Sequence, residues 1–220
     1  MRPLALWLSP FSACLVALAT TQPCSAQATV EITPFVGIFS PTSALVSISG
    51  TCLGGVGHCG TYPVTQSGGR AVGARLTIWG GSSLAFDLSL TSASTDVTIP
   101  AVPNGFDFSQ PQGGGSVRTT IGSVGLLLAL SSSLYVGAGM SIVGLGGSAF
   151  NTDGPVGSAQ TDGGGEATIG LRLPIARALA LRMELGDVVY FFSGEASPHN
   201  ALTLSLGSSI VVGGQRKAAR

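Results

Sequence analysis

The residues that could do chemistry in this chain are a few charged side chains set within apolar segments. Charged residues are only 9% of the sequence, against roughly 25% in a typical soluble domain. The formal net charge is zero, so no basic surplus is present to hold nucleic-acid phosphates. A few positive and negative side chains in equal number are suited to pairing with one another. We single out five residues as candidates for a buried charge network: Arg75, Asp87, Arg172, Arg182 and Glu184.

Catalytic chemistry has little support in the sequence. The histidines are His58 and His199, and a Ser-His-Asp arrangement needs the histidine within hydrogen-bond reach of the nucleophile. His199 would have to act with Asp96, Asp107 or a loop serine, but no motif singles out that combination. No G-x-S-x-G, H-E-x-x-H or Walker pattern occurs. We therefore predict that the chain is not an enzyme and holds no cofactor or catalytic metal.

The cysteines predict a small covalent loop. Cys52 and Cys59 lie in a Gly-rich segment, whereas Cys14 and Cys24 are expected to be removed with an N-terminal leader. In an oxidising compartment the first pair is most simply a disulfide. A closed zinc site usually takes four ligands, and His58 is the one additional candidate nearby.

The charged residues must be positioned by segments in which apolar and smaller or polar residues alternate. In residues 84–91, Leu84, Phe86, Leu88 and Leu90 occupy every second position. Since successive side chains of a strand point to opposite faces, this segment has one apolar and one polar face. Eight such segments are expected to be strands: 30–39, 70–79, 84–94, 116–129, 134–145, 166–175, 179–191 and 201–212.

The connections between these segments are alternately long and short. Tight turns are expected at 80–83, 131–133 and 176–178, and long segments lie between the other pairs. Outer-membrane barrels have an even number of strands, short periplasmic turns and longer outer loops. A closed barrel also leaves no unpaired backbone in lipid. The sequence thus predicts an all-β fold, an eight-stranded antiparallel up-and-down transmembrane β-barrel.

The N-terminus has the features of a secretory signal peptide. Arg2 supplies the positive charge, residues 4–19 form an apolar stretch, and small residues provide a cleavage site. We predict a signal peptide at 1–26, with cleavage after 26 or 28, a barrel at 27–213 and a short polar tail at 214–220. The expected location is the outer membrane, reached by secretion to the periplasm.

Such a barrel would turn its apolar faces to lipid and its charged faces to the lumen. A lipid-facing Arg or Lys near the midplane costs about 2–4 kcal/mol, so the five candidates should face inward and pair. Glu31 and Glu166 are expected near strand ends. Because an eight-stranded barrel is just wide enough for side chains to fill, we predict a polar plug. An ion-pair gate across a narrow pore is the alternative.

Aromatic residues near the predicted strand ends suggest girdles at the two lipid–water interfaces. Phe39 and residues 190–192 would lie at the outer end, and Trp79 and Tyr135 at the periplasmic end.

Several segments of the predicted barrel carry patterns of a known group of proteins. They are 30–37 in the first strand, 182–189 in the seventh and 199–200 at the entry to the last. The last strand fits an assembly signal at four positions: Ser205, Gly207, Ile210 and Val212. On these patterns the mature chain resembles small bacterial outer-membrane β-barrel proteins of OmpA-like type. That group usually has an aromatic residue where this chain has Val212. The resemblance implies insertion by the barrel-assembly machinery.

We predict a structural scaffold in outer-membrane lipid that presents its outer loops to an extracellular ligand. A narrow porin-like channel for small solutes is the alternative. Two other classes receive less support, a soluble lipocalin-like carrier and an outer-membrane lipid-modifying enzyme. A lipocalin-like carrier would be apolar inside and polar outside, the inverse of the pattern expected here.

Overall fold

The computed structural model describes residues 28–52, 58–98, 106–107, 115–150, 159–191 and 198–212, and gives no side-chain detail for 46–62 and 106–107. The predicted signal peptide, 1–26, and the tail, 214–220, lie outside these residues, so both remain predictions.

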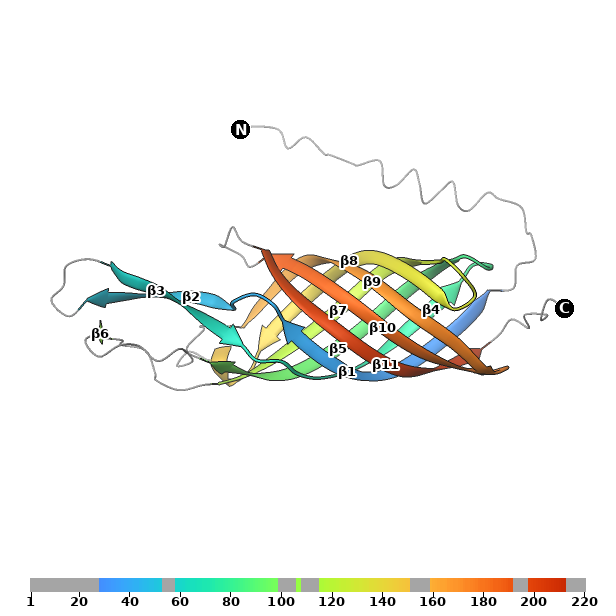
Figure 1. The fold of residues 1–220 in the computed structure, drawn as a ribbon, viewed down its shortest axis with the longest axis horizontal. Helices are drawn as coiled ribbons and strands as arrows, with labels where there is room; N and C mark the ends of the chain where they lie inside the picture. Colours follow the sequence, from blue (N-terminus) through green and yellow to red (C-terminus); the bar gives the residue numbers. More distant parts are fainter. Residues whose placement is uncertain are drawn as a thin grey trace, which may run out of the picture.

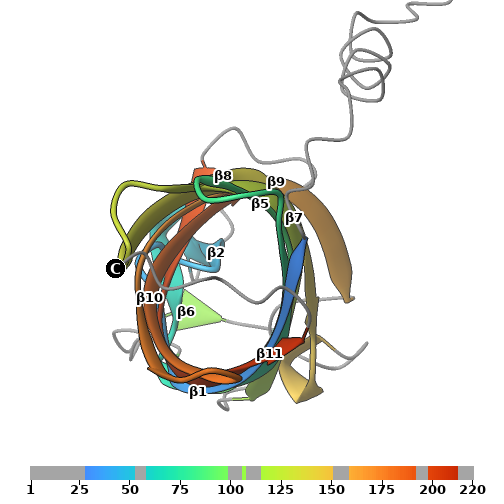
Figure 2. The ribbon, with the colours of Figure 1, turned by 90° about the vertical axis from the view of Figure 1, so that its right-hand side faces the viewer.

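Eight strands form a closed antiparallel ring in the order β4-β1-β11-β10-β9-β8-β7-β5, and pairing of β4 with β5 closes it (Figures 1 and 2). Their bounds are β1 Thr29–Pro41, β4 Gly69–Trp79, β5 Leu84–Thr98, β7 Ser116–Ala129, β8 Leu134–Gly146, β9 Gln160–Ala176, β10 Leu179–Phe191 and β11 Pro198–Val212. The predicted eight-stranded up-and-down barrel is therefore confirmed. Within the described residues, no helix is long and apolar enough to span a membrane.

The wall turns its apolar residues outward and its charged residues inward. Phe86, Leu88 and Leu204 are 41%, 39% and 48% exposed, whereas Arg75 and Arg182 are 7% and 3% exposed. This is the arrangement of a barrel whose outer surface contacts lipid and whose lumen is polar. It is the opposite of a soluble carrier with an apolar interior.

Most strands extend beyond their predicted bounds, and β5 and β9 do so by the most. β5 continues to Thr98, and β9 begins at Gln160 rather than at residue 166. The missed part of β9 contains Gly163, Gly164 and Gly165, and glycine is depleted in strands. These glycines are nevertheless paired, with β8 on one side and partly with β10 on the other. Pairing on both sides compensates for their weak strand preference.

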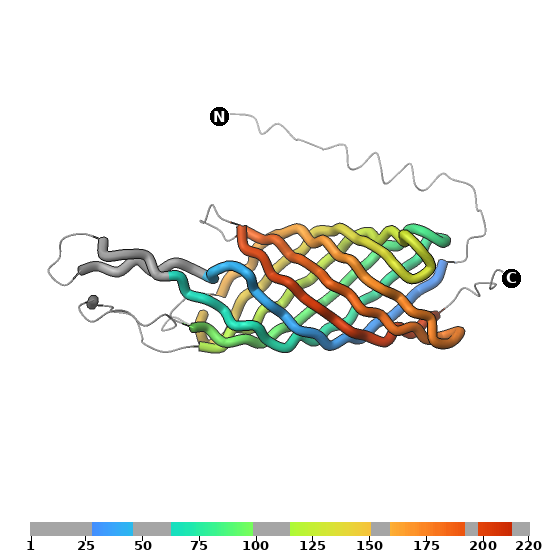
Figure 3. The backbone as a smooth tube through the Cα atoms, viewed as in Figure 1, coloured from blue at the N-terminus to red at the C-terminus, as the bar shows by residue number. Residues whose placement is uncertain are grey.

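The long first connection is folded rather than irregular. It contains β2 (Val46–Cys52) and β3 (His58–Gln66), which pair as an antiparallel hairpin. The hairpin projects from the end of the barrel opposite the short turns (Figure 1), and the tube in Figure 3 shows the tilt of the barrel strands. The end of β3 pairs with the end of β5, and β2 pairs with the short β6 (Phe106–Asp107). The first outer loop is thus built as an extension of the wall.

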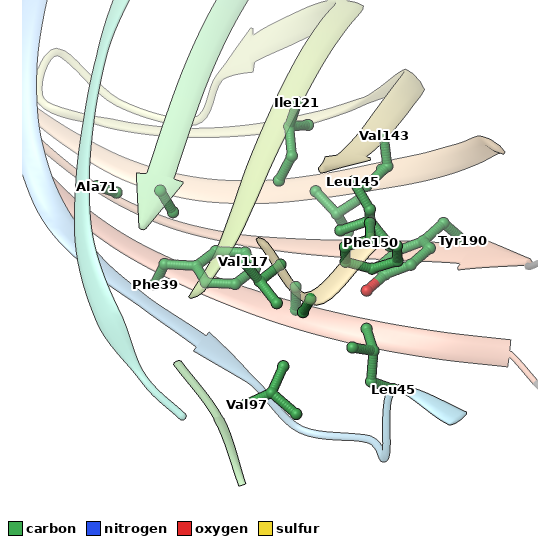
Figure 4. Close-up of a cluster of buried hydrophobic side chains, with 14 of the residues drawn as sticks. Phe39, Leu45, Ala71, Val97, Val117, Ile121, Val143, Leu145, Phe150 and Tyr190 are labelled. Carbon is green, nitrogen blue, oxygen red and sulfur yellow. The ribbon is translucent and has the colours of Figure 1, made fainter. Parts of the chain in front are cut away.

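The outer end of the lumen is filled by an apolar cluster (Figure 4). It includes Phe39, Leu45 and Tyr190, together with Phe150 from the 3-10 helix η1 (Ser148–Phe150). A smaller cluster at the periplasmic end contains Trp79 and Tyr135.

The predicted aromatic girdles are therefore wrong for four residues. Phe39, Tyr190, Trp79 and Tyr135 are 0%, 2%, 6% and 2% exposed and lie on the inward face. Phe191, 55% exposed, does point outward. The strand alternation decides which way a side chain points, and large rings fill the lumen where the charged side chains do not reach.

Candidate functional site: the charge layer of the lumen

Four of the five predicted lumen charges meet in one network, which we call the charge layer: Arg75 of β4, Asp87 of β5, and Arg182 and Glu184 of β10. The Arg75 guanidinium lies 2.8 Å from Asp87 Oδ2 and also contacts Glu184. Arg182 Nη2 lies 3.1 Å from Glu184 Oε2 and 3.7 Å from Asp87 Oδ1. Two positive and two negative groups are thus balanced among buried side chains.

The charge layer crosses the whole lumen. β5 and β10 are four strands apart in both directions around the ring, so they lie on opposite sides of it. The contact between Asp87 and Arg182 joins these opposite walls. On each strand the charged residue stands at an inward position of the alternating pattern, because the intervening residues face lipid. The layer therefore occupies the cross-section through which a solute would have to pass.

Two uncharged side chains complete the network. Thr77 Oγ1 donates to Asp87 Oδ1 at 2.6 Å and accepts from Arg182 Nη1 at 2.8 Å. The Tyr135 hydroxyl donates to Glu184 Oε2 at 2.7 Å and accepts from Arg182 Nε at 2.6 Å. The Arg182 guanidinium also lies 4.6 Å from the centre of the Tyr135 ring, within cation–π range.

Sequence reasoning did not include Thr77 and Tyr135 in the charge network. The alternation of the strands does contain this information. Thr77 stands two residues after Arg75 and therefore shares its face. Tyr135 stands between the outward-facing Leu134 and Val136 and therefore faces inward. Alternation alone would have placed both side chains in the lumen.

The fifth predicted charge, Arg172 of β9, lies outside the charge layer. It pairs with Glu31 of β1 at 2.6 Å, and Glu31 is fully buried. The pair adjoins a vestibule of about 1180 Å³ at the periplasmic end, which Trp79 and Tyr135 also border; the Arg172 side chain is 14% exposed, whereas that of Glu31 has no exposed surface. The charge layer thus has an open approach from the side of the short turns.

The lumen on the outer side of the charge layer is largely filled. The cavity beside Arg75, Glu166 and Glu184 measures about 20 Å³, room for roughly one water molecule. Beyond it lies the apolar cluster with Phe39 and Tyr190. The described residues therefore place two different obstacles in series, one charged and one apolar.

One glycine gives Tyr135 its position. Gly170 of β9 is directly opposite Tyr135 in the register, and a Cβ there would overlap the tyrosine ring. We expect Gly170→Ala to lower the free energy of unfolding by about 2–3 kcal/mol, because Tyr135 must shift away from its charged partners. The measurement is urea unfolding in lipid vesicles followed by the fluorescence of Trp79.

The matched control is Gly163→Ala in the same strand. Gly163 faces outward and a Cβ there meets no atom within 4 Å. This change should be neutral or slightly stabilising, since alanine restricts the unfolded chain more than glycine does. Equal losses in the two variants would show that Tyr135 does not depend on the bare backbone at Gly170.

The other predicted site residues lie apart from the charge layer. His199 is buried at the outer end, where its Nδ1 is 3.4 Å from Ser43 Oγ and its ring stacks on Tyr190. The side chains of Cys52 and Cys59 are among those without detail, so the disulfide stays a prediction. The proposed assembly-signal residues all lie in β11, two facing inward and two outward: Ser205, Gly207, Ile210 and Val212.

Comparison with known proteins identifies the fold. No protein-family model matches the sequence. No curated protein matches it in sequence. Among solved structures, the outer membrane protein OprG from Pseudomonas aeruginosa is similar, with a TM-score of 0.55 and 11% identity over 85% of this chain and 96% of that one. The outer membrane protein AlkL, solved in lipid bilayers, has a TM-score of 0.52 and 16% identity over 89% of this chain and 93% of that one. The chain has the fold of the small eight-stranded barrels of bacterial outer membranes.

Proposed function

We propose that this protein is a sealed outer-membrane scaffold that presents the β2–β3 hairpin and its other outer loops at the cell surface, without enzymatic activity. One observation carries the proposal: the charge layer of Arg75, Asp87, Arg182 and Glu184 joins opposite walls of the lumen. The apolar cluster toward the outer end supports it, because a second seal would remain if the first were loosened. The projecting hairpin supports the presenting role.

A narrow channel for small solutes is the second candidate. The observation in its favour is the periplasmic vestibule of about 1180 Å³, which reaches the ion pair of Glu31 and Arg172. In that case the charge layer would act as a gate whose ion pairs separate to admit solute.

Conductance in planar lipid bilayers distinguishes the two functions. For the purified protein we expect no unitary current steps, because side chains fill an eight-stranded barrel. Current steps that scale with the number of inserted barrels would contradict the sealed scaffold and support the channel.

A charge-neutral double variant, Arg182→Gln with Glu184→Gln, sharpens this test. It removes one positive and one negative group from the charge layer and leaves the apolar cluster intact. The sealed scaffold predicts that the variant stays silent, whereas an ion-pair gate predicts larger or more frequent currents. Heat-modifiable gel migration should show first that the variant has folded.

A further inference from the structure

The outer rim of the wall carries two arginines on its lipid-facing side. Arg70 of β4 and Arg118 of β7 are both exposed and lie on the outward face of their strands. Ser94 of β5 stands between them, paired in register with Arg70 on one side and with Arg118 on the other. Two strand spacings place the arginine backbones about 10 Å apart. Neither side chain forms an ion pair with another described residue.

A groove of about 510 Å³ adjoins this pair. Arg118 is the one charged residue in its described lining, and the other polar groups are hydroxyls and an amide: Ser94, Ser116, Thr120, Gln160 and Thr161. Gly144, Gly146 and Gly147 contribute bare backbone. At Gly146 a Cβ would meet no atom within 4 Å, so open space lies beside the backbone there. Among the described residues, the groove thus offers one cation and several donors and has no carboxylate in its lining.

The groove lies where the apolar belt ends. On the outward face of β5, Leu90 is followed by Ser92 and Ser94, and on β7 the apolar run ends at Val124 before Thr120 and Arg118. Charged side chains on the lipid side of a barrel cost little near the interface and much at the midplane. Arg70 and Arg118 are therefore at the depth of lipid headgroups, with acyl-chain surface directly beside them.

We infer that this groove binds the phosphate of a membrane lipid headgroup in the outer leaflet. An arginine guanidinium matches a phosphate with two parallel hydrogen bonds, and the neighbouring hydroxyls can donate to the remaining phosphate oxygens. The ligand is a lipid because the groove is on the wall, on the outward face that carries the exposed Leu90 and Val124 four residues further toward the midplane from Ser94 and Thr120. The carboxylate of Asp96, two residues beyond Ser94, is not part of the lining. The site does not depend on whether the lumen conducts.

Native mass spectrometry in a neutral detergent tests the inference, with phosphatidic acid as the phosphate-bearing probe and phosphatidylcholine as the reference lipid. The unaltered protein should retain one phosphatidic acid in preference to phosphatidylcholine. Arg118→Gln and Arg70→Gln should each weaken this binding about fivefold, the effect of one arginine at an anionic lipid surface. Arg177→Gln is the control, since Arg177 is exposed in the short turn at the opposite end and should change nothing.

A second pair of variants tests the groove without changing charge. Gly146→Val should fill it and weaken phosphatidic acid binding, because the space beside Gly146 is open. Gly122→Val adds the same side chain at another open outward position, outside the groove lining, and should have no effect. At both positions an added Cβ meets no atom within 4 Å, so both variants should fold.

Three results would overturn the inference. One is unchanged phosphatidic acid binding in Arg118→Gln. Another is an equal loss in Arg177→Gln, which would indicate general charge attraction rather than a site. The third is displacement of the bound lipid by an equal concentration of inorganic phosphate, which would assign the groove to the free anion.

Discussion

Replacing Glu184 by glutamine is expected to lower the free energy of unfolding by about 3–5 kcal/mol. Glu184 contacts Arg75, lies 3.1 Å from Arg182 and accepts a hydrogen bond from Tyr135. Without its charge, two buried guanidinium groups share Asp87 as their one anionic partner in the charge layer. Removing one member of a buried ion pair is strongly destabilising because the remaining charge is neither hydrated nor compensated. Urea unfolding in lipid vesicles, followed by Trp79 fluorescence, gives the measurement.

Glu166→Gln is the matched control for this prediction. Glu166 also faces the lumen but forms no ion pair with another described residue. The same chemical change there should cost at most about 1 kcal/mol, since no buried positive charge is left behind. If both variants lose the same stability, the charge layer does not hold the barrel in the way that its geometry implies.

The Glu31–Arg172 pair should respond unequally to the loss of its two members. We expect Arg172→Gln to cost about 3 kcal/mol, because Glu31 is fully buried and its carboxylate then has no cation beside it. Glu31→Gln should cost only about 1 kcal/mol, since the Arg172 side chain remains 14% exposed and borders the open vestibule. A guanidinium that reaches water can be hydrated, whereas a buried carboxylate cannot.

A double-mutant cycle checks this asymmetry. The variant with both glutamines should be more stable than Arg172→Gln alone, because no charge is left buried. Additive losses in the two single variants would mean that the residues act independently and that the pair contributes no coupling energy. The same unfolding assay serves for all three proteins.

The predictions for Glu184 and for the Glu31–Arg172 pair concern contacts that could be predicted only in part from the sequence. The chain indicated that Arg75, Asp87, Arg182 and Glu184 would share the interior, because each stands at an alternate position among outward apolar residues. It did not indicate which of them would pair. Arg182 and Thr77 are 105 positions apart in the chain and meet because the barrel closes.

The first loop and the start of β9 show a second limit of sequence reasoning. These segments form strands because other strands pair with them: β3 pairs with β5, and the glycines at 163–165 pair with β8. A glycine-rich segment has little strand preference of its own. Its conformation is decided by the hydrogen bonds that neighbouring strands offer.

The residue types along the chain are enough to predict the wall of this protein: eight barrel strands, their antiparallel order and the face on which each side chain lies. That information is local, since side chains in a strand alternate with a period of two and lipid tolerates only apolar residues on the outer face. Only the closed barrel decides how the lumen charges pair and why Arg172 stands apart from the charge layer. Those outcomes depend on the register with which the strands close into a ring, and no single strand contains that register.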